Sequence, residues 1–118
     1  DPPLLHQVDL FNGLQGAGYI LINSSRSFEA LGLGEFAHAH HYRVCTLPAS
    51  ELALKHVGRP LPNTALLGGF AAFSREIKLE SVIAAIREKF PAKIAARNIA
   101  AATEAYETVA RSKETAHA

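Results

Sequence analysis

Three histidines close together in the sequence form the most metal-like group in this chain: His38, His40 and His41, in the segment HAHH. Neutral imidazole is a common ligand of zinc and related ions, but a metal site needs further ligands that converge in space. Glu35 is the only acidic residue close to these histidines in the sequence. We therefore interpret the segment as a polar loop before a strand, and we expect no metal site in this chain.

The single cysteine, Cys45, lies in an apolar segment that we predict to be a buried strand. A reactive cysteine needs neighbours that stabilise its thiolate, whereas a cysteine among apolar residues usually contributes packing. One cysteine excludes an internal disulfide and leaves too few thiolates for an iron–sulfur cluster. We expect a reducing, cytoplasmic location, and we identify no catalytic nucleophile, base or metal-ligand set.

Asn23, Ser24 and Ser25 are polar residues placed where a ligand could bind. They follow the apolar run over residues 19–22, which is typical of a strand buried on both faces in a parallel sheet. In α/β proteins, ligands usually lie at the carboxyl ends of such strands. The glycines between Gly13 and Gly18 precede this strand instead of following it, so the signature of a dinucleotide-binding loop is absent.

The helix that we expect from Asn63 to Phe73 is the element around which the rest is organised. Pro62 stops the preceding segment and Asn63 is placed to cap the helix, with a ligand contact as the alternative. An apolar face is predicted for Leu66, Leu67, Phe70 and Phe73. Each glycine inside a helix costs about 1 kcal/mol, so the pair Gly68 and Gly69 suggests close approach of another backbone, in this chain or in a partner.

The remaining elements also follow from apolar spacing, turns and prolines. We predict a first helix within residues 1–11, a turn over 27–33, a strand over 42–47 and helices over 49–57, 79–90 and 93–111. Asn98 falls on the apolar face of the last helix, where it needs a hydrogen-bond partner in a neighbouring loop or, alternatively, in a ligand. The tail from Ser112 is expected to fray.

Two strands cannot cover this many apolar helix faces, so the predicted domain lacks part of its sheet. We expect an α/β fold over residues 1–118, a Rossmann-like domain of three layers with a mostly parallel sheet, part of which precedes residue 1. A partner chain would cover further surface. The net charge of +1 argues against binding to nucleic acid, and no apolar run is long enough to cross a membrane.

Several short motifs resemble, in their order and spacing, the gamma subunit or gamma domain of the 2-oxoacid:acceptor oxidoreductases, the pyruvate:ferredoxin oxidoreductase family. The most specific is GRPxxNTAxLG, which begins at Gly58 and ends at Gly68. The others are Asp1-Pro2-x-Leu4-Leu5, Leu21-Ile22-Asn23-Ser24, Pro48-Ala49-x-Glu51-Leu52-Ala53, Leu79-Glu80-Ser81 and Ala95-x-x-Asn98-x-x-Ala101, which leads to Tyr106-Glu107. Ala105 stands where the family usually has glycine, and the family's opening strand and GxGGQG-type loop are absent.

The resemblance implies the C-terminal two-thirds of a gamma domain in a thiamine-diphosphate enzyme. Such enzymes oxidatively decarboxylate a 2-oxoacid to acyl-CoA and pass electrons through iron–sulfur clusters to ferredoxin or another acceptor. Thiamine diphosphate, magnesium and the clusters would be held by alpha and beta subunits, with or without a ferredoxin-like delta subunit. This chain would help to shape the coenzyme A site, and its positions nearest a cofactor would be Asn23, Ser24, Asn63 and Thr64.

Two other functions are compatible with parts of the sequence. A free-standing Rossmann-like protein that binds a nucleotide or coenzyme would use Asn23, Ser24 and Ser25, but it needs a phosphate loop. A helical adaptor with no enzyme context would require that no sheet forms.

Overall fold

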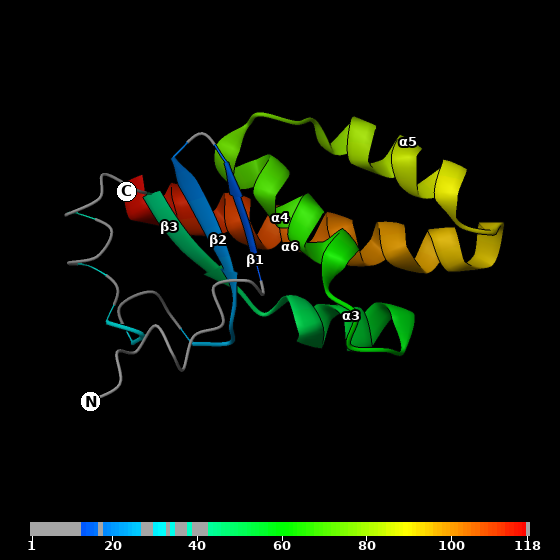
Figure 1. Ribbon diagram of the computed structural model, residues 1–118, viewed down its shortest axis with the longest axis horizontal. Coiled ribbons are helices and arrows are strands. Elements are labelled where there is room, and N and C mark those ends of the chain that lie inside the picture. Colours follow the sequence, from blue (N-terminus) through cyan, green and yellow to red (C-terminus); the bar gives the residue numbers. More distant parts are fainter. Residues whose placement is uncertain are drawn as a thin grey trace.

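The computed structural model describes residues 13–16, 18–26, 30–32, 34, 38 and 43–117. The helix predicted within residues 1–11 and most of the turn predicted over 27–33 lie outside the described residues. The described part forms three strands and four helices, with the sheet at one end and the helices extending away from it (Figure 1).

The sheet contains strands β1 (Gly13–Gly16), β2 (Tyr19–Asn23) and β3 (Arg43–Leu47), in the order β1-β2-β3. β2 and β3 are parallel, as the sequence predicts, and they pair from Tyr19 opposite Arg43 to Asn23 opposite Leu47. Ile20, Leu21 and Ile22 are all buried, which confirms that β2 is covered on both faces.

β1 was not among the elements predicted from the sequence, in which no strand was expected over residues 13–16. β1 pairs with β2 in antiparallel orientation through a two-residue connection, where Gly18 has a φ of 84° that favours glycine. A strand of four residues with a glycine at each end carries almost no propensity signal. The described sheet is therefore mixed, with one antiparallel and one parallel pairing.

The helices agree closely with the apolar spacing of the sequence. They are α3 (Ala49–Val57), α4 (Asn63–Ser74), α5 (Leu79–Lys89) and α6 (Ala92–His117). Gly58 ends α3 in the left-handed conformation, which glycine adopts readily. Ile77 and Val82 pack in one cluster at the start of α5, the arrangement of a hydrophobic staple. α6 continues through His117, beyond the end predicted near residue 111.

α4 occupies the centre of the molecule, between the sheet and the other helices. Ten of its twelve residues are buried, including the small residues Ala65, Gly68, Gly69 and Ala72. Leu67 is the exception among the large apolar residues, since it is 38% exposed. A helix that is buried all round has no polar face to mark its orientation, so the sequence could not show which side meets which neighbour.

α4 and α6 run in the same direction, and at one point the backbone of α4 lies directly against the backbone of α6. Thr64 of α4 bonds to Asn98 of α6, and a Cβ atom on Gly68 would overlap the carbonyl group of Ala102. Gly69 faces the sheet instead, where a Cβ would lie 2.7 Å from a methyl of Leu47 and 3.1 Å from one of Leu21. The prediction of close approach is thus confirmed, and both contacts are internal to this chain.

The core lies between the sheet and the pair α4 and α6, while α5 covers a second, smaller cluster against α6. Leu21, Leu47 and Val109 are fully buried in the main core. The smaller cluster contains Ala71, Val82, Ile86, Ala95 and Ala102. α6 contacts all three other helices and therefore holds the two clusters together.

Candidate functional site

The carboxyl ends of β2 and β3 lie side by side, as expected for the strands that carry a ligand site. Asn23 is the last residue of β2 and pairs with Leu47, the last residue of β3. The backbone N–H of Ser24 donates to the Leu47 carbonyl over 2.9 Å. The polar segment after β2 is therefore fixed next to the point where the chain leaves β3 for α3.

The side chain of Asn23 caps α3 from another element. Its Oδ1 accepts the backbone N–H of Ser50 over 3.1 Å, and its Nδ2 donates to the Ser50 hydroxyl oxygen over 2.7 Å. Pro48, the residue before α3, provides no side-chain cap, so Asn23 satisfies one of the free N–H groups of the first turn. Sequence reasoning missed this role because the two residues are far apart in the chain.

Ser24 closes a short local turn. Its hydroxyl oxygen accepts the backbone N–H of Arg26 over 3.0 Å, and the Arg26 guanidinium donates to the carbonyl of Ala30 over 3.1 Å. Ser24 is half-buried, whereas Ser25 and Arg26 are exposed. The loop therefore presents polar groups next to the end of the sheet.

Asn63 does not cap α4, which corrects the prediction. It is the first helical residue instead of the one before it, and Pro62 in that place makes no side-chain cap. Asn63 is exposed. α4 therefore begins at Asn63 without a side-chain cap. Pro62, the residue before it, has backbone angles in the helical region.

Thr64 and Asn98 form a buried polar pair between α4 and α6. Thr64 and Asn98 are 8% and 6% exposed, and the Thr64 hydroxyl donates to Asn98 Oδ1 over 2.7 Å. Asn98 Nδ2 donates to the carbonyl of Ile94, one turn earlier in α6, over 3.0 Å. Asn98 thus has the hydrogen-bond partner that it was expected to need, but the partner is helix α4 of this chain instead of the neighbouring loop that we predicted.

The four candidate positions fall into two groups on different elements. Asn23 and Ser24 end β2, and Asn63 and Thr64 begin α4. Asn23 bonds to Ser50 of α3 and Thr64 bonds to Asn98 of α6, so these two side chains join neighbouring elements. Within the described residues, the side chains of Ser24 and Asn63 do not join one helix or strand to another. The geometry allows a binding surface with polar positions on two elements.

An ion-pair cluster between α3 and α6 was not anticipated. Lys55 Nζ lies 2.9 Å from Glu104 Oε1, and His56 Nε2 lies 2.6 Å from the same oxygen. The hydrogen bonds from Lys55 and His56 hold the pKa of the Glu104 carboxyl below its usual value. No local motif links positions that lie almost fifty residues apart, so sequence alone gave no signal of the cluster.

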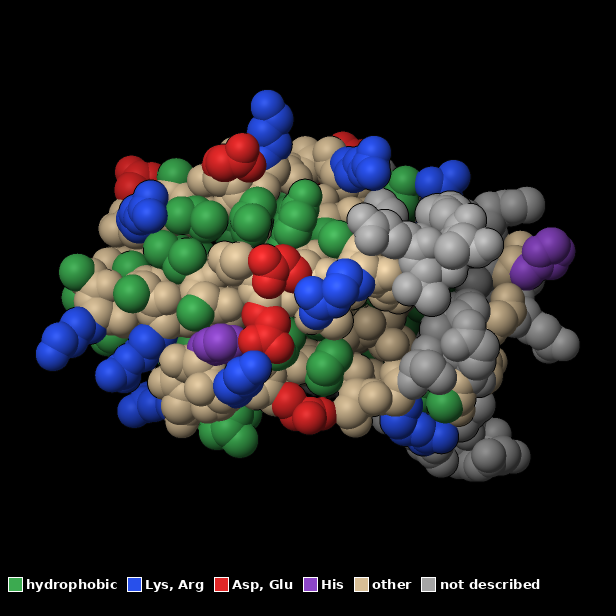
Figure 2. All heavy atoms as spheres, turned by 180° about the vertical axis from the view of Figure 1, so that it is seen from behind, with side chains coloured by type: hydrophobic (Ala, Val, Ile, Leu, Met, Phe, Trp, Pro, Cys, Tyr) green, Lys and Arg blue, Asp and Glu red, His purple; other side chains and the backbone are tan. Residues whose placement is uncertain are grey.

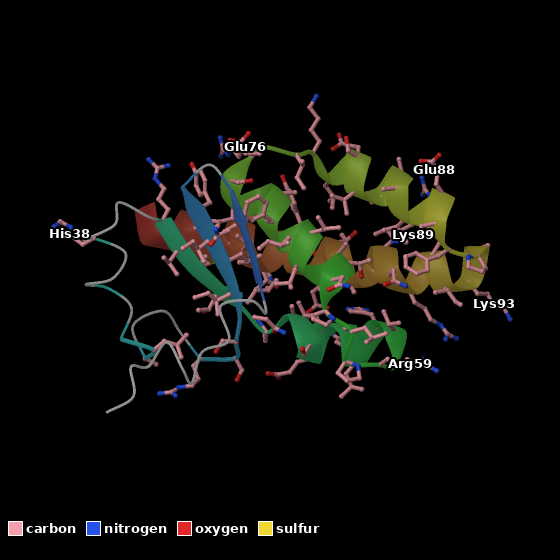
Figure 3. All side chains as sticks on the ribbon, in the orientation of Figure 1. His38, Arg59, Glu76, Glu88, Lys89 and Lys93 are labelled. Carbon is pink, nitrogen blue, oxygen red and sulfur yellow. The ribbon has the colours of Figure 1, made fainter. Side chains whose placement is uncertain are left out.

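The histidines of the HAHH segment and Cys45 form no ion-pair cluster or metal site in the described part of the chain. His38 is exposed and extends outward (Figure 3), whereas His40, His41 and Glu35 lie outside the described residues. Among the residues that the structure places, no three histidine, cysteine, aspartate or glutamate side chains are grouped to hold a metal ion. Cys45 is half-buried and packs against the main core, as its apolar neighbours predict.

No helix within the described residues is both long and apolar enough to cross a membrane.

Residues 1–108 match the family model described as pyruvate ferredoxin/flavodoxin oxidoreductase. The chain is 38% identical over 112 residues to pyruvate synthase subunit PorC of Methanothermobacter marburgensis, covering 95% of this chain and 58% of the relative. It is 35% identical over 107 residues to the common gamma subunit of the pyruvate/ketoisovalerate oxidoreductases of Pyrococcus furiosus, covering 91% and 57%.

A solved structure shows the same fold. The crystal structure of pyruvate oxidoreductase subunit PORC from Thermotoga maritima superposes with a TM-score of 0.63 at 26% identity, covering 80% of this chain and 52% of that one. The chain thus spans little more than half the length of the relatives it matches.

Proposed function

The chain belongs to the pyruvate ferredoxin/flavodoxin oxidoreductase family, and from this membership we propose that it acts as part of the gamma subunit of a 2-oxoacid:acceptor oxidoreductase. The enzyme would oxidatively decarboxylate a 2-oxoacid, transfer the acyl group to coenzyme A and pass two electrons to ferredoxin or another acceptor. The observation that carries the proposal is the alignment with a pyruvate synthase subunit, which covers 95% of this chain at 38% identity.

The cofactors of such an enzyme would be held by other subunits. An iron–sulfur cluster needs several thiolates, and this chain has one cysteine, so its residues do not fit that group. Thiamine diphosphate with magnesium supplies the carbanion chemistry of decarboxylation when bound, and we assign it to the alpha and beta subunits. A ferredoxin-like delta subunit and a cytoplasmic location belong to the same proposal.

This chain would contribute structure and one wall of the coenzyme A site. Ser24 and Asn63 are the positions that we propose to face the coenzyme, and Asn23 and Thr64 would hold them in place through Ser50 and Asn98. In the assembled protein, further strands would extend the three-stranded sheet into a Rossmann-like domain of three layers. The structural match to a longer PORC subunit supports this extension.

A free-standing nucleotide-binding protein is not favoured. That function needs a glycine loop after a strand, and the glycines in question form strand β1 instead. A helical adaptor is excluded because a sheet is present.

Purification at native expression level tests the proposal. We expect the chain to copurify with larger subunits that contain thiamine diphosphate, and the complex to reduce ferredoxin only when coenzyme A and a 2-oxoacid are supplied. Pyruvate and 2-ketoisovalerate are the first substrates to try, since they are named for the relatives. A chain that elutes alone, without thiamine-containing partners, would contradict the proposal.

A further inference from the structure

Helix α3 and the segment after it separate the two groups of candidate site positions. β3 ends at Leu47, beside Asn23, and α3 follows and ends at Val57. Residues 58–62 then lead directly to Asn63 at the start of α4. The nine residues of α3, at a rise of about 1.5 Å each, span about 14 Å. The placement of α3 therefore sets much of the distance from the end of the sheet to Asn63.

The first half of α3 is held by burial and by a cap, whereas its last turn is not buried. The buried residues of the helix are Ala49, Leu52 and Ala53. In the first turn, Ser50 bonds to the side chain of Asn23. Residues 54–57, in the last turn, are exposed or half-buried. Packing therefore holds the start of α3 more firmly than its end.

Glu104 of α6 fastens this last turn. Lys55 Nζ donates to Glu104 Oε1 over 2.9 Å, and His56 Nε2 lies 2.6 Å from the same oxygen. Figure 2 shows a histidine, an acidic and a basic side chain side by side on the rear surface, the arrangement that these two ion pairs produce. The side chains of His56 and Glu104 are 23% and 32% exposed, so water competes less with their contact than with that of Lys55, at 62%.

No charged side chain of α4 competes for this contact. α4 also packs against α3, but its sequence, NTALLGGFAAFS, contains no titratable residue. The polar connection of the last turn of α3 to its neighbours is therefore made to α6, at Glu104.

The segment between α3 and α4 is short and restrained, so it transmits the position of one helix end to the next. Gly58 bonds through its backbone N–H to α3 itself. Pro60 and Pro62 each fix one φ angle, and the Leu61 N–H donates to the Arg59 carbonyl over 2.8 Å. A displacement of the last turn of α3 would therefore be carried to the first residue of α4.

That first residue, Asn63, lies between two anchors on α6. Glu104 holds the end of α3 before it, and Asn98 holds Thr64, the residue after it. The side chain of Asn63 is exposed. Its direction depends on the backbone between the two anchors, and the anchor at Thr64 would keep α4 folded if the one at Glu104 were lost.

We propose that Glu104 is a positioning residue for coenzyme A binding, an inference that rests on the proposed function. Glu104 would act through α3 and residues 58–62, which place Asn63, and would not itself touch the coenzyme. Without the carboxylate, the last turn of α3 would move more freely and Asn63 would occupy its contact position less often. An interaction lost equally from the bound substrate and the transition state raises KM and leaves kcat unchanged.

Steady-state kinetics of the complete enzyme complex, with Glu104→Ala in this subunit, test the proposal. We expect KM for coenzyme A to rise at least about fivefold, while kcat and the KM for the 2-oxoacid stay within about twofold. Calorimetry of the complex with coenzyme A alone should show the same loss of affinity without turnover. A merely structural role would lower Tm or the active fraction, and kcat with it, but would leave KM for coenzyme A unchanged.

A second substitution shows whether Glu104 acts through Asn63. Asn63→Ala alone should raise KM for coenzyme A. Adding Glu104→Ala to it should raise KM little further, because the side chain that Glu104 positions is already gone. An equal further rise in the double variant, or no effect of Asn63→Ala, would overturn the proposal.

Matched variants keep the test decisive. Glu104→Gln retains an oxygen acceptor and should recover much of the affinity. Glu88→Ala removes an exposed carboxylate of α5 (Figure 3) and should leave KM unchanged. If Glu104→Ala does not assemble, His56→Ala weakens the same contact from α3 and should raise KM in the same direction. If the natural complex binds no coenzyme A, the proposed function itself fails; if it binds and no Glu104 or His56 variant changes KM, only the positioning role fails.

Discussion

Gly68 lies against the backbone of Ala102 where α4 meets α6, and replacing it by alanine should destabilise the fold. The added methyl group would overlap the backbone of Ala102, and neither helix can shift without disturbing the core. We expect a loss of about 1–3 kcal/mol, despite a gain of about 1 kcal/mol in helix propensity. Thermal or urea unfolding of the isolated chain measures the difference.

Gly69→Ala is the matched control, since it has the same effect on propensity within the same helix. Its new methyl group would meet side-chain atoms instead of backbone: the ends of Leu47 and Leu21, which can rotate, and a methyl of Val109 at 3.4 Å, an ordinary contact distance. The loss should therefore be smaller than for Gly68→Ala. Equal stabilisation by both substitutions would show that the two helices are not in close contact.

The Thr64–Asn98 pair should behave as a unit. Thr64→Val removes the hydroxyl and leaves the buried Asn98 Oδ1 without its donor, which should cost about 1–3 kcal/mol. The double variant Thr64→Val, Asn98→Leu removes the donor and acceptor together and should be more stable than the sum of the single changes predicts. Unfolding curves of the four proteins give the coupling, and additive losses would refute it. Thr64→Ser, which keeps the hydroxyl, is the control.

At the residue scale, the sequence showed that certain side chains need a hydrogen-bond partner, but it did not show which group is the partner. Asn98 on an apolar face had to be bonded, and it is. Asn63 was wrongly assigned as a helix cap, and the cap that Asn23 provides for α3 was missed. Capping rules operate within a few residues of a helix end, whereas Asn23 arrives from a strand through the tertiary fold.

At the scale of elements, Asn23 couples the end of the sheet to the start of α3. Asn23→Ala should lower the unfolding free energy by about 1 kcal/mol, as for other lost N-terminal caps. Asn23→Asp keeps an oxygen for the Ser50 N–H and adds a charge that favours a helix N-terminus, so it should retain most of that stability. Chemical denaturation compares the two; equal losses would exclude a capping role.

Glu104 joins α3 to α6 in a way that depends on pH. Because its pKa is lowered in the folded protein, its contribution to stability is complete above the unfolded value, about 4.3, and is lost as the pH falls through the folded pKa. The free energy of unfolding should therefore decline more steeply with acidification below about pH 4.3 in the natural chain than in Glu104→Gln. Urea titrations at a series of pH values test this, and parallel profiles would contradict it.

The helices were predictable because each carries a periodic apolar face or a clear stop signal, such as Gly58 and Pro91. Strand β1 could not be predicted in this way. Two of its four residues are glycines, which are typical of turns, and it is recognised as a strand only by its pairing with β2. The end of α6 was placed too early because its polar last turns lack an apolar face to mark them. Local rules thus found the elements with strong periodicity and missed the one that exists only through its partner.

At the scale of the whole molecule, the sequence indicated the α/β class, but not the arrangement of the elements in space. The parallel register of α4 and α6 results from small residues at their contact, which match many alternative registers equally well. The four candidate positions lie at the end of β2 and the start of α4, and the hydrogen-bond partners of Asn23 and Thr64 depended on the tertiary fold.

The burial of α4 on all sides has a consequence for motion. Its backbone amides are shielded by the sheet, α5 and α6 at once, so no local opening of one neighbour exposes them all to water. We expect the amides of Ala65 to Phe73 to exchange their hydrogens only when the whole domain opens, and those of α5 to exchange sooner. Native-state hydrogen exchange followed by NMR would show the order, and faster exchange in α4 than in α5 would contradict it. The exchange rates of the α4 amides would then measure how often the whole domain opens.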